Sequence, residues 1–377
     1  MKKYVTLFSL SLALLAGCDN LEQNTSTENI SEETSTSENA SEQSFGSAAS
    51  AVTVDFDALD PNSIENEPAY NTPISVGFTG QMCNSAGTIA HELGYFAEQD
   101  LEIEMTNIEH SNGIDALATG KLDLYNTHVS SYVVPIVNGV NATLITPAQT
   151  GCKSLYVLED SGIESTAELE GQSIAVPNGI GASDHNIALR FLNRDGVDTE
   201  SVTYKPVETS AAVQSLESGE IQGVILDDQF AYDFVENGTL KSIRSLTSDD
   251  DFGSEPCCAF ALNTDFINEN PLTSQRIAKA IIKARYWMQG NPDEAVTILD
   301  EQDQISGDID VATEIFKTYN WTVTNEEAKE GFENITNEYK ELGLVETEES
   351  TDSIVERNYN SLGITDEDIQ EVIDGGF

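Results

Sequence analysis

Hydrophobic and polar positions recur in a regular order through the middle of the chain. Short apolar runs predict strands, and stretches with apolar side chains three or four residues apart predict helices. Between residues 74 and 147 the pattern predicts strands at Ile74–Thr79, Leu101–Asn107, Leu122–Asn126 and Ala142–Pro147, and helices at Ser85–Gln99, Asn112–Thr119 and His128–Val137. Strands alternating with helices are typical of a mainly parallel sheet covered by helices.

A second series of the same kind begins after Gly171. It predicts strands at Ser173–Pro177, Val202–Pro206 and Ile221–Leu226, and helices at Ser183–Arg194 and Ser210–Ser218. Two such series in tandem predict two α/β lobes. From Leu272 onward helical spacing dominates. One buried stripe is expected there, formed by Ile277, Ile281, Ala284 and Met288.

The N-terminal region follows neither pattern. Two lysines precede an apolar run from Val5 to Leu15, which is too short for a stable membrane span and is typical of an export signal. The run ends in Leu-Ala-Gly-Cys18, which resembles the lipobox of bacterial lipoproteins. We therefore expect a signal peptide at residues 1–17, lipidation of Cys18, and an extracytoplasmic protein anchored to the cell membrane by its lipid.

The segment that follows is rich in Ser, Thr, Asn and Glu. It contains no Lys or Arg between Asp19 and Tyr70, and its only apolar stretch is short, from Ala51 to Leu59. Such a composition cannot bury enough apolar surface to offset the entropy lost on ordering. We therefore expect residues 18–70 to form a disordered acidic tether.

The charge of the chain limits its partners. There are 17 Lys and Arg against 66 Asp and Glu, which gives a formal net charge of −49. This excludes a nucleic-acid binder, because binding to a phosphate backbone needs a basic surface. The excess of acid is spread along the chain and indicates a halophilic protein from a salt-rich habitat, where screening weakens the repulsion among the charges.

Three segments are similar to one family of solute-binding proteins. Ile89 to Phe96, followed by Asp100 to Glu104, resembles the helix, Gly-Tyr-Phe and strand near the start of the nitrate, sulfonate, taurine, bicarbonate and thiamine-precursor binding proteins of ABC transporters. Ala116 to Asp123 resembles the helix, glycine and strand that come next in that family. Leu169 to Pro177 resembles the beginning of its second lobe. The resemblance runs from about Ile74 to Asn270.

The resemblance implies an α/β, two-lobed periplasmic-binding-protein-like fold of type 2, with the ligand cleft between the lobes. The two crossings between the lobes are expected near Leu158–Gly162 and Ser254–Leu262. Lobe 1 would comprise residues 71–158 and 257–377, including the C-terminal helices, and lobe 2 residues 159–256.

The same resemblance implies a function. The protein would capture a small solute, act as a monomer, and deliver the solute to a permease and its ATPase without making or breaking a bond. Two alternatives stay open on the same fold: an iron-dependent pyrimidine-synthase-like enzyme or a soft-metal-binding protein, and a lipoprotein that senses its ligand without transport. Pro256 to Phe260 resembles, incompletely, the Cys-rich stretch of the pyrimidine synthases, two of whose thiols are missing here.

In open α/β sheets, ligands bind at the carboxyl ends of strands and at helix N-termini. The loops after Thr79, Asn126, Pro177 and Leu226 are therefore the expected site. Its candidate ligand-binding residues are Gln81, Met82, Cys83, Asn84, Thr127, His128, Ser130, Gly181, Ser183, Asp184 and Asp227. The acids Asp184, Asp227 and Asp228 favour an organic ligand with hydrogen-bond donors over a bare inorganic anion, because an acid competes with an anion for a positive helix end.

Four further cysteines, Cys83, Cys152, Cys257 and Cys258, fall on segments that the topology brings to the cleft. Three interpretations are open. They form disulfides, with Cys83 to Cys152 as one candidate pair, as is common in exported proteins. They are buried thiols that act as small hydrophobic groups. They form a soft-metal site together with Met82 and His128, since thiolates favour zinc, copper(I) or iron. No other cofactor is expected.

Overall fold

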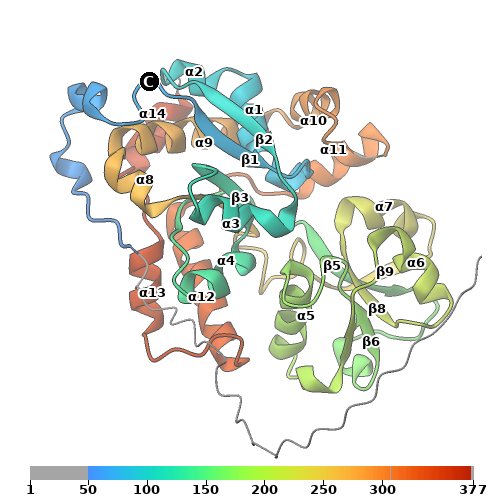
Figure 1. Ribbon diagram of the computed structural model, residues 1–377. Coiled ribbons are helices and arrows are strands. Elements are labelled where there is room, and N and C mark those ends of the chain that lie inside the picture. The colour runs from blue at the N-terminus through green and yellow to red at the C-terminus, as the bar shows by residue number, and fades with distance from the viewer. Residues whose placement is uncertain (1–49, 306, 375–377) are drawn as a thin grey trace, which may run out of the picture. The chain divides into compact units, whose positions relative to one another are not determined.

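The computed structural model describes residues 50–305 and 307–374 (Figure 1). The expected signal peptide, Cys18 and most of the expected tether lie outside the described residues. The described chain is a mixed α/β structure with two five-stranded sheets. Within the described ranges, no helix combines the length and the apolar character that a membrane span needs.

The first sheet has the strand order β2-β1-β3-β10-β4. Strand β1 pairs in parallel with β2 and β3, whereas β10 lies antiparallel between β3 and β4. The strands are β1 (Ile74–Phe78), β2 (Ile103–Asn107), β3 (Leu124–His128), β4 (Thr143–Pro147) and β10 (Cys258–Leu262).

The second sheet repeats this plan with the order β7-β6-β8-β5-β9. Strand β6 is parallel to β7 and β8, and β5 lies antiparallel between β8 and β9. The strands are β5 (Lys153–Leu158), β6 (Ser173–Ala175), β7 (Thr203–Lys205), β8 (Gly223–Asp227) and β9 (Leu240–Ser245). Each sheet thus contains one antiparallel strand, β10 or β5, that the chain enters directly after leaving the other sheet.

Helices α1 and α2 pack with α9 beside the first sheet, and α5, α6 and α7 pack on the second sheet (Figure 1). The helices of the described residues are α1 (Ala86–Glu92), α2 (Tyr95–Glu98), α3 (Gly113–Ala118), α4 (Val129–Val137), α5 (Ser183–Arg194), α6 (Thr209–Glu217), α7 (Asp228–Glu236), α8 (Thr264–Glu269), α9 (Pro271–Gly290), α10 (Pro292–Glu301), α11 (Ile309–Thr318), α12 (Asn325–Glu341), α13 (Thr351–Asn358) and α14 (Asp366–Ile373).

The strands and helices expected from the two hydrophobic series are confirmed to within about two residues, with one exception. The single helix expected at Ser85–Gln99 is two helices, α1 and α2. Gly94 separates them with a φ of +74°, a left-handed conformation that ends a helix and that glycine adopts without steric cost. The buried stripe expected on the C-terminal helix is confirmed, because all four of its side chains are fully buried on α9.

The positions of the crossings differ from the expectation. Strand β4 ends at Pro147 and β5 begins in the second sheet at Lys153, so the first crossing lies at residues 148–152 and not at 158–162. The return lies between β9 and β10, at residues 246–257. The hydrophobic pattern did not predict β5 and β10, the strands that follow the two crossings. Both strands are buried on both faces and therefore lack the alternation of apolar and polar residues, and β5 also begins with Lys and Ser.

The end of the expected tether is packed against the folded body. Carboxylate oxygens of Glu67 accept hydrogen bonds from the backbone N–H groups of Leu272 (2.6 Å) and Thr273 (2.9 Å) at the start of α9. A carboxylate at a helix N-terminus satisfies N–H groups that have no partner within the helix. Residues 50–70 are therefore part of the folded structure, and the expectation of a tether extending to residue 70 was wrong.

Candidate functional site

A cavity of about 270 Å³ lies where loops of the first sheet meet loops of the second. Its first wall is the loop after β1, and its second is the junction of β8 with α7. Segments after α10 and α11 complete it. The lining residues are Gly80, Gln81, Met82, Cys83, Thr209, Asp227, Gln229, Phe230, Asp303, Gln304, Ile305 and Tyr319.

The chemistry of the lining is polar but poor in positive charge. Among the described residues that line the cavity, none is Lys, Arg or His. Three side-chain amides, two carboxylates and two aromatic rings face it instead. Amide and carboxylate oxygens accept hydrogen bonds, and aromatic rings offer flat apolar surface. The cavity is therefore suited to a small organic molecule with hydrogen-bond donors.

A buried lysine lies behind the second wall. The Lys153 Nζ atom is 3.0 Å from Asp227 Oδ1 and 3.2 Å from Asp184 Oδ1. Burial lowers the pKa of Lys153, but the two carboxylates raise it by more, so the pKa lies well above its ordinary value. The lysine is therefore charged and pairs with both acids from inside the protein, which offsets one of their two negative charges.

The three acids expected in the cleft have different places. Asp184 is fully buried and also accepts a hydrogen bond from the Asn178 backbone N–H (2.9 Å). Asp228 points into the second sheet, where Tyr156 Oη donates to it at 2.8 Å. Only Asp227 lines the cavity, and about a third of its side chain (34%) is exposed.

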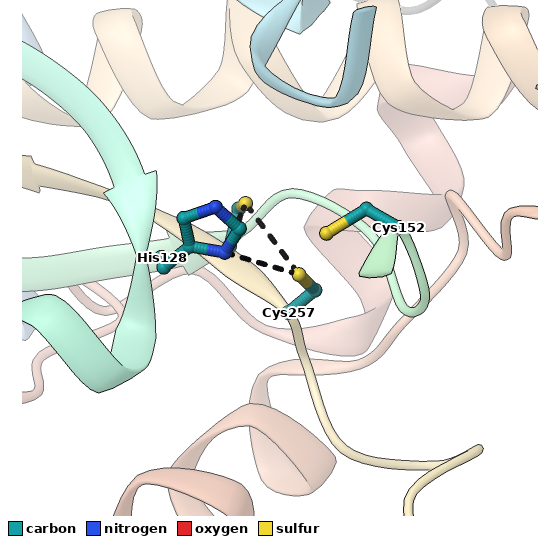
Figure 2. A group of neighbouring side chains, drawn as sticks. His128, Cys152 and Cys257 are labelled. Atoms are coloured by element: carbon teal, nitrogen blue, oxygen red, sulfur yellow. Dashed lines mark hydrogen bonds between the residues drawn. The ribbon is translucent and has the colours of Figure 1, made fainter. Parts of the chain in front are cut away.

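A second group of side chains is formed by His128, Cys152, Cys257 and Cys258. Figure 2 labels the first three of them. Their potential ligand atoms all lie within 4.8 Å of one another, and all four residues are buried. The His128 Nδ1 atom is 3.3 Å from Cys257 Sγ and 3.8 Å from Cys258 Sγ. The two adjacent Sγ atoms of Cys257 and Cys258 are 3.9 Å apart. We refer to these four residues as the thiol–imidazole cluster.

Three segments of the chain build this cluster. His128 ends β3 and lies opposite Cys258 in the antiparallel β3–β10 ladder. Cys152 comes from the first crossing and Cys257 from the return. Cys152 has a φ of +141°, which is strained for a residue with a side chain. Its N–H donates to Thr247 Oγ1 at 3.0 Å, which holds it in that conformation.

The members of the cluster shift one another's pKa values. Burial raises the pKa of Cys258, but neighbouring thiols and the His128 ring lower it by more, to well below its ordinary value. Burial lowers the pKa of His128, and the charge of Cys258 raises it by more. A lower pKa favours the thiolate, which is the form of cysteine that binds metals.

Of the three interpretations of the cysteines, the structure does not support disulfides. All four cysteines of the described chain are free and buried, so the expected Cys83–Cys152 pair is absent. The Cys83 thiol interacts with Cys152 and Cys258 and also lines the cavity. The buried-thiol and soft-metal interpretations both fit this arrangement.

The sequence-predicted site residues divide between these places. Four of them line the cavity, namely Gln81, Met82, Cys83 and Asp227. His128 belongs to the thiol–imidazole cluster. The others do not line the cavity, namely Asn84, Thr127, Ser130, Gly181, Ser183 and Asp184.

Several cavity residues were not predicted. Thr209 begins the helix after β7, so the strand-end rule would have found it if applied to that strand as well. Gln229 lies in the expected loop after Leu226, where only the acids were considered. Gln304 and Tyr319 follow helices in the C-terminal region. No motif in the sequence marks them, because only the packing of α10 and α11 brings them to the cavity.

Comparisons with known proteins agree with this fold. One relative is a protein of Brucella abortus (strain 2308) whose name describes it provisionally as a binding protein. It is 24% identical to this chain over 241 residues, which are 61% of this chain and 71% of the relative. The periplasmic aliphatic sulphonate binding protein SsuA from Escherichia coli superposes with a TM-score of 0.61 at 16% identity, covering 76% of this chain and 92% of SsuA. The periplasmic nitrate-binding protein NrtA from Synechocystis PCC 6803 gives a TM-score of 0.64 at 15% identity, covering 81% and 89%.

These neighbours confirm the two-lobed, type 2 periplasmic-binding-protein-like fold. The pattern of the family described as NMT1/THI5 like matches residues 84–295, which is more than half of the chain. The matched region contains the thiol–imidazole cluster and the junction of β8 with α7, and it begins just after the loop that follows β1. The chain therefore belongs to the NMT1/THI5 like family.

Proposed function

We propose that this protein is the substrate-binding component of an ABC importer and captures a small organic solute outside the cytoplasm. The observation that carries the proposal is the cavity of about 270 Å³, which loops from both sheets line together. A site of this kind can close around a ligand by hinge motion at the two crossings. The closed form would then be presented to a permease and its ATPase, with no bond made or broken.

The chemistry of the lining defines the proposed solute class. Bare nitrate or a simple sulfonate would meet Asp227 and Asp303 in a cavity whose described lining holds no cationic side chain. A ligand with N–H donors or a positive charge would pair with Asp227, donate to the amides of Gln81 or Gln304, and stack on an aromatic ring. We therefore propose a donor-rich organic solute, such as a heterocyclic or aliphatic amine.

The proposed location follows from the N-terminal sequence. Lipidation at Cys18 would anchor the protein to the outer face of the cell membrane as a monomer. The acidic segment after Cys18 would hold the folded body away from the anionic membrane surface. Metabolic labelling with a fatty acid tests this, because the label should disappear in Cys18→Ser and persist in the parent chain.

The test of the solute is a calorimetric titration of the purified chain with matched compounds. Nitrate, methanesulfonate, an aminopyrimidine and a diamine represent the competing classes. We expect one of the amines to bind at micromolar concentration, and Asp227→Asn to weaken this binding by about 10- to 100-fold, since hydrogen bonds to charged groups contribute about 1.5–3 kcal/mol. Asp233→Asn is the matched control, because Asp233 lies exposed on the same helix, α7, and outside the cavity.

Two results would contradict the proposal. One is micromolar binding of nitrate or methanesulfonate with no binding of either amine. The other is an equal loss of affinity in Asp227→Asn and Asp233→Asn, which would place the solute elsewhere. Mass spectrometry of the solute recovered after binding completes the test, because a changed mass would indicate an enzyme.

A further inference from the structure

The thiol–imidazole cluster lies outside the lining of the cavity, and the proposed transport function does not use it. A thiol is a weak hydrogen-bond donor and a weak acceptor. Contacts among thiols therefore give little reason for three cysteines and one histidine from distant segments to meet in the interior. Thiolates and imidazoles that converge in this way are the ligands of soft metal ions.

We propose a closed, four-coordinate zinc site whose ligands are His128, Cys152, Cys257 and Cys258. Tetrahedral zinc has Zn–S bonds of about 2.3 Å and Zn–N bonds of about 2.0–2.1 Å, which separate two sulfurs by about 3.8 Å and a sulfur from a nitrogen by about 3.6 Å. The Cys257–Cys258 Sγ distance is 3.9 Å, and the distances from His128 Nδ1 to those two atoms are 3.3 and 3.8 Å. These three distances lie within about 0.3 Å of the corresponding edges of the required tetrahedron.

The fourth ligand, Cys152, completes the site from a different direction. Its thiol points toward the other side chains in Figure 2, and its Sγ atom lies within 4.8 Å of their ligand atoms. Small rotations of the side chains would bring it to bonding distance. The strained backbone of Cys152 and its hydrogen bond to Thr247 Oγ1 keep the thiol directed inward.

Backbone hydrogen bonds position the remaining ligands. The Cys257 N–H donates to the carbonyl of Gln149 (2.8 Å), and the Cys257 carbonyl accepts from the N–H of Val129 (2.9 Å). The Cys258 carbonyl accepts from the N–H of Ala148 (2.8 Å). The two crossings and the end of β3 are therefore held together before any metal binds, and such preorganised ligands favour metal binding.

The burial of the cluster indicates a structural site. Every ligand is buried, and a fourth protein ligand leaves no position for water or substrate, which is the arrangement of structural zinc sites. Zinc at this position would link the first crossing to the return crossing. It would thus fix the two segments that connect the sheets.

The test measures zinc and its ligands directly. The full chain is purified without chelator or oxidant, incubated with zinc, desalted and analysed for metal content, and its zinc environment is determined by X-ray absorption spectroscopy. We expect about one zinc per chain with three sulfur ligands and one nitrogen ligand. Substitution with Co²⁺ should give the intense visible bands of a tetrahedral thiolate site.

Variants then identify the ligands. Cys152→Ser and Cys257→Ser should each weaken zinc binding by more than about 100-fold, because even changes outside the ligand set cost 10- to 100-fold. Cys83→Ser is the matched control and should retain the metal, because Cys83 is a buried thiol outside the four-residue group. The spectroscopy of the parent chain keeps the proposal testable if a variant fails to fold.

Four results would overturn the assignment. The first is a parent chain that holds less than a tenth of an equivalent of zinc although the thiols of Cys83, Cys152, Cys257 and Cys258 all react on denaturation. The second is a disulfide between any of these cysteines in peptide mapping, and the third is copper or iron bound in preference to zinc. The fourth is loss of zinc in Cys83→Ser to the same degree as in Cys152→Ser. Solute titration has no part in this test, so the proposed function and the zinc site can fail independently.

Discussion

The two sheets contribute opposite kinds of chemistry to the cavity. The first sheet contributes the loop after β1, where Gln81, Met82 and Cys83 carry no charge. The second sheet contributes Asp227, whose carboxylate is already paired with the buried Lys153. Acidic residues near a site thus differ in the negative charge that they offer a ligand, because Lys153 offsets one of the two charges of Asp184 and Asp227 and only Asp227 lines the cavity.

The largest expected effect tests whether Lys153 is the counter-charge of the second sheet. Lys153→Met leaves Asp184 buried without its cation, so we expect the free energy of unfolding to fall by about 3–5 kcal/mol. Urea titration at constant salt measures this. Lys241→Met is the control, because Lys241 pairs with the exposed Glu164 and such a pair contributes about 0–1 kcal/mol. Equal losses in the two variants would show that the second sheet does not depend on a buried charge.

Removal of the proposed zinc should cause the next largest loss of stability. Its ligands lie at the end of β3, on the two crossings and at the start of β10. A ligand present at about 1,000 times its dissociation constant stabilises the folded state by about 4 kcal/mol. A strong chelator should therefore lower the midpoint of thermal unfolding by about 10 °C. Calorimetry with and without chelator measures this shift. The Cys152→Ser variant should show no shift, and an unchanged midpoint in the parent chain would contradict a structural role.

The salt dependence of solute binding is a smaller effect, and it shows whether Asp227 recognises the solute through its charge. The 10- to 100-fold affinity loss expected for Asp227→Asn should shrink as KCl is raised, because Asp227 is partly exposed and salt screens its charge. Titrations at low and high KCl measure this change. A loss that does not depend on salt would mean that the solute contacts Asp227 only through neutral hydrogen bonds.

The smallest expected effect concerns the neutral side of the cavity. Gln81→Ala removes one neutral hydrogen-bonding group, which contributes about 0.5–1.5 kcal/mol, so affinity should fall by about 2- to 10-fold. The loss should be the same at both salt concentrations. If Gln81→Ala proved as damaging and as salt-sensitive as Asp227→Asn, the chemical distinction between the two sheets would be wrong.

Sequence reasoning was accurate where local signals decide the structure. The alternation of strands and helices follows from periodicity, which a helix or strand imposes on its own residues. The loop after β1 was found for the same reason, since a strand end followed by a glycine and polar residues is a local feature. The break at Gly94 and the burial of β5 were not foreseen, because each depends on how a segment packs against others.

Sequence reasoning was enough to predict the α/β class, the resemblance to solute-binding proteins and the presence of cysteines near the crossings. Only the tertiary structure decided that those thiols surround His128, that Asp184 pairs with Lys153, and that Gln304 and Tyr319 reach the cavity. The physical reason is the range of the interactions. Periodicity and turn chemistry act between neighbours in the chain, whereas metal-binding geometry, ion pairing and cavity lining join residues that are far apart in sequence and come together only when the core packs.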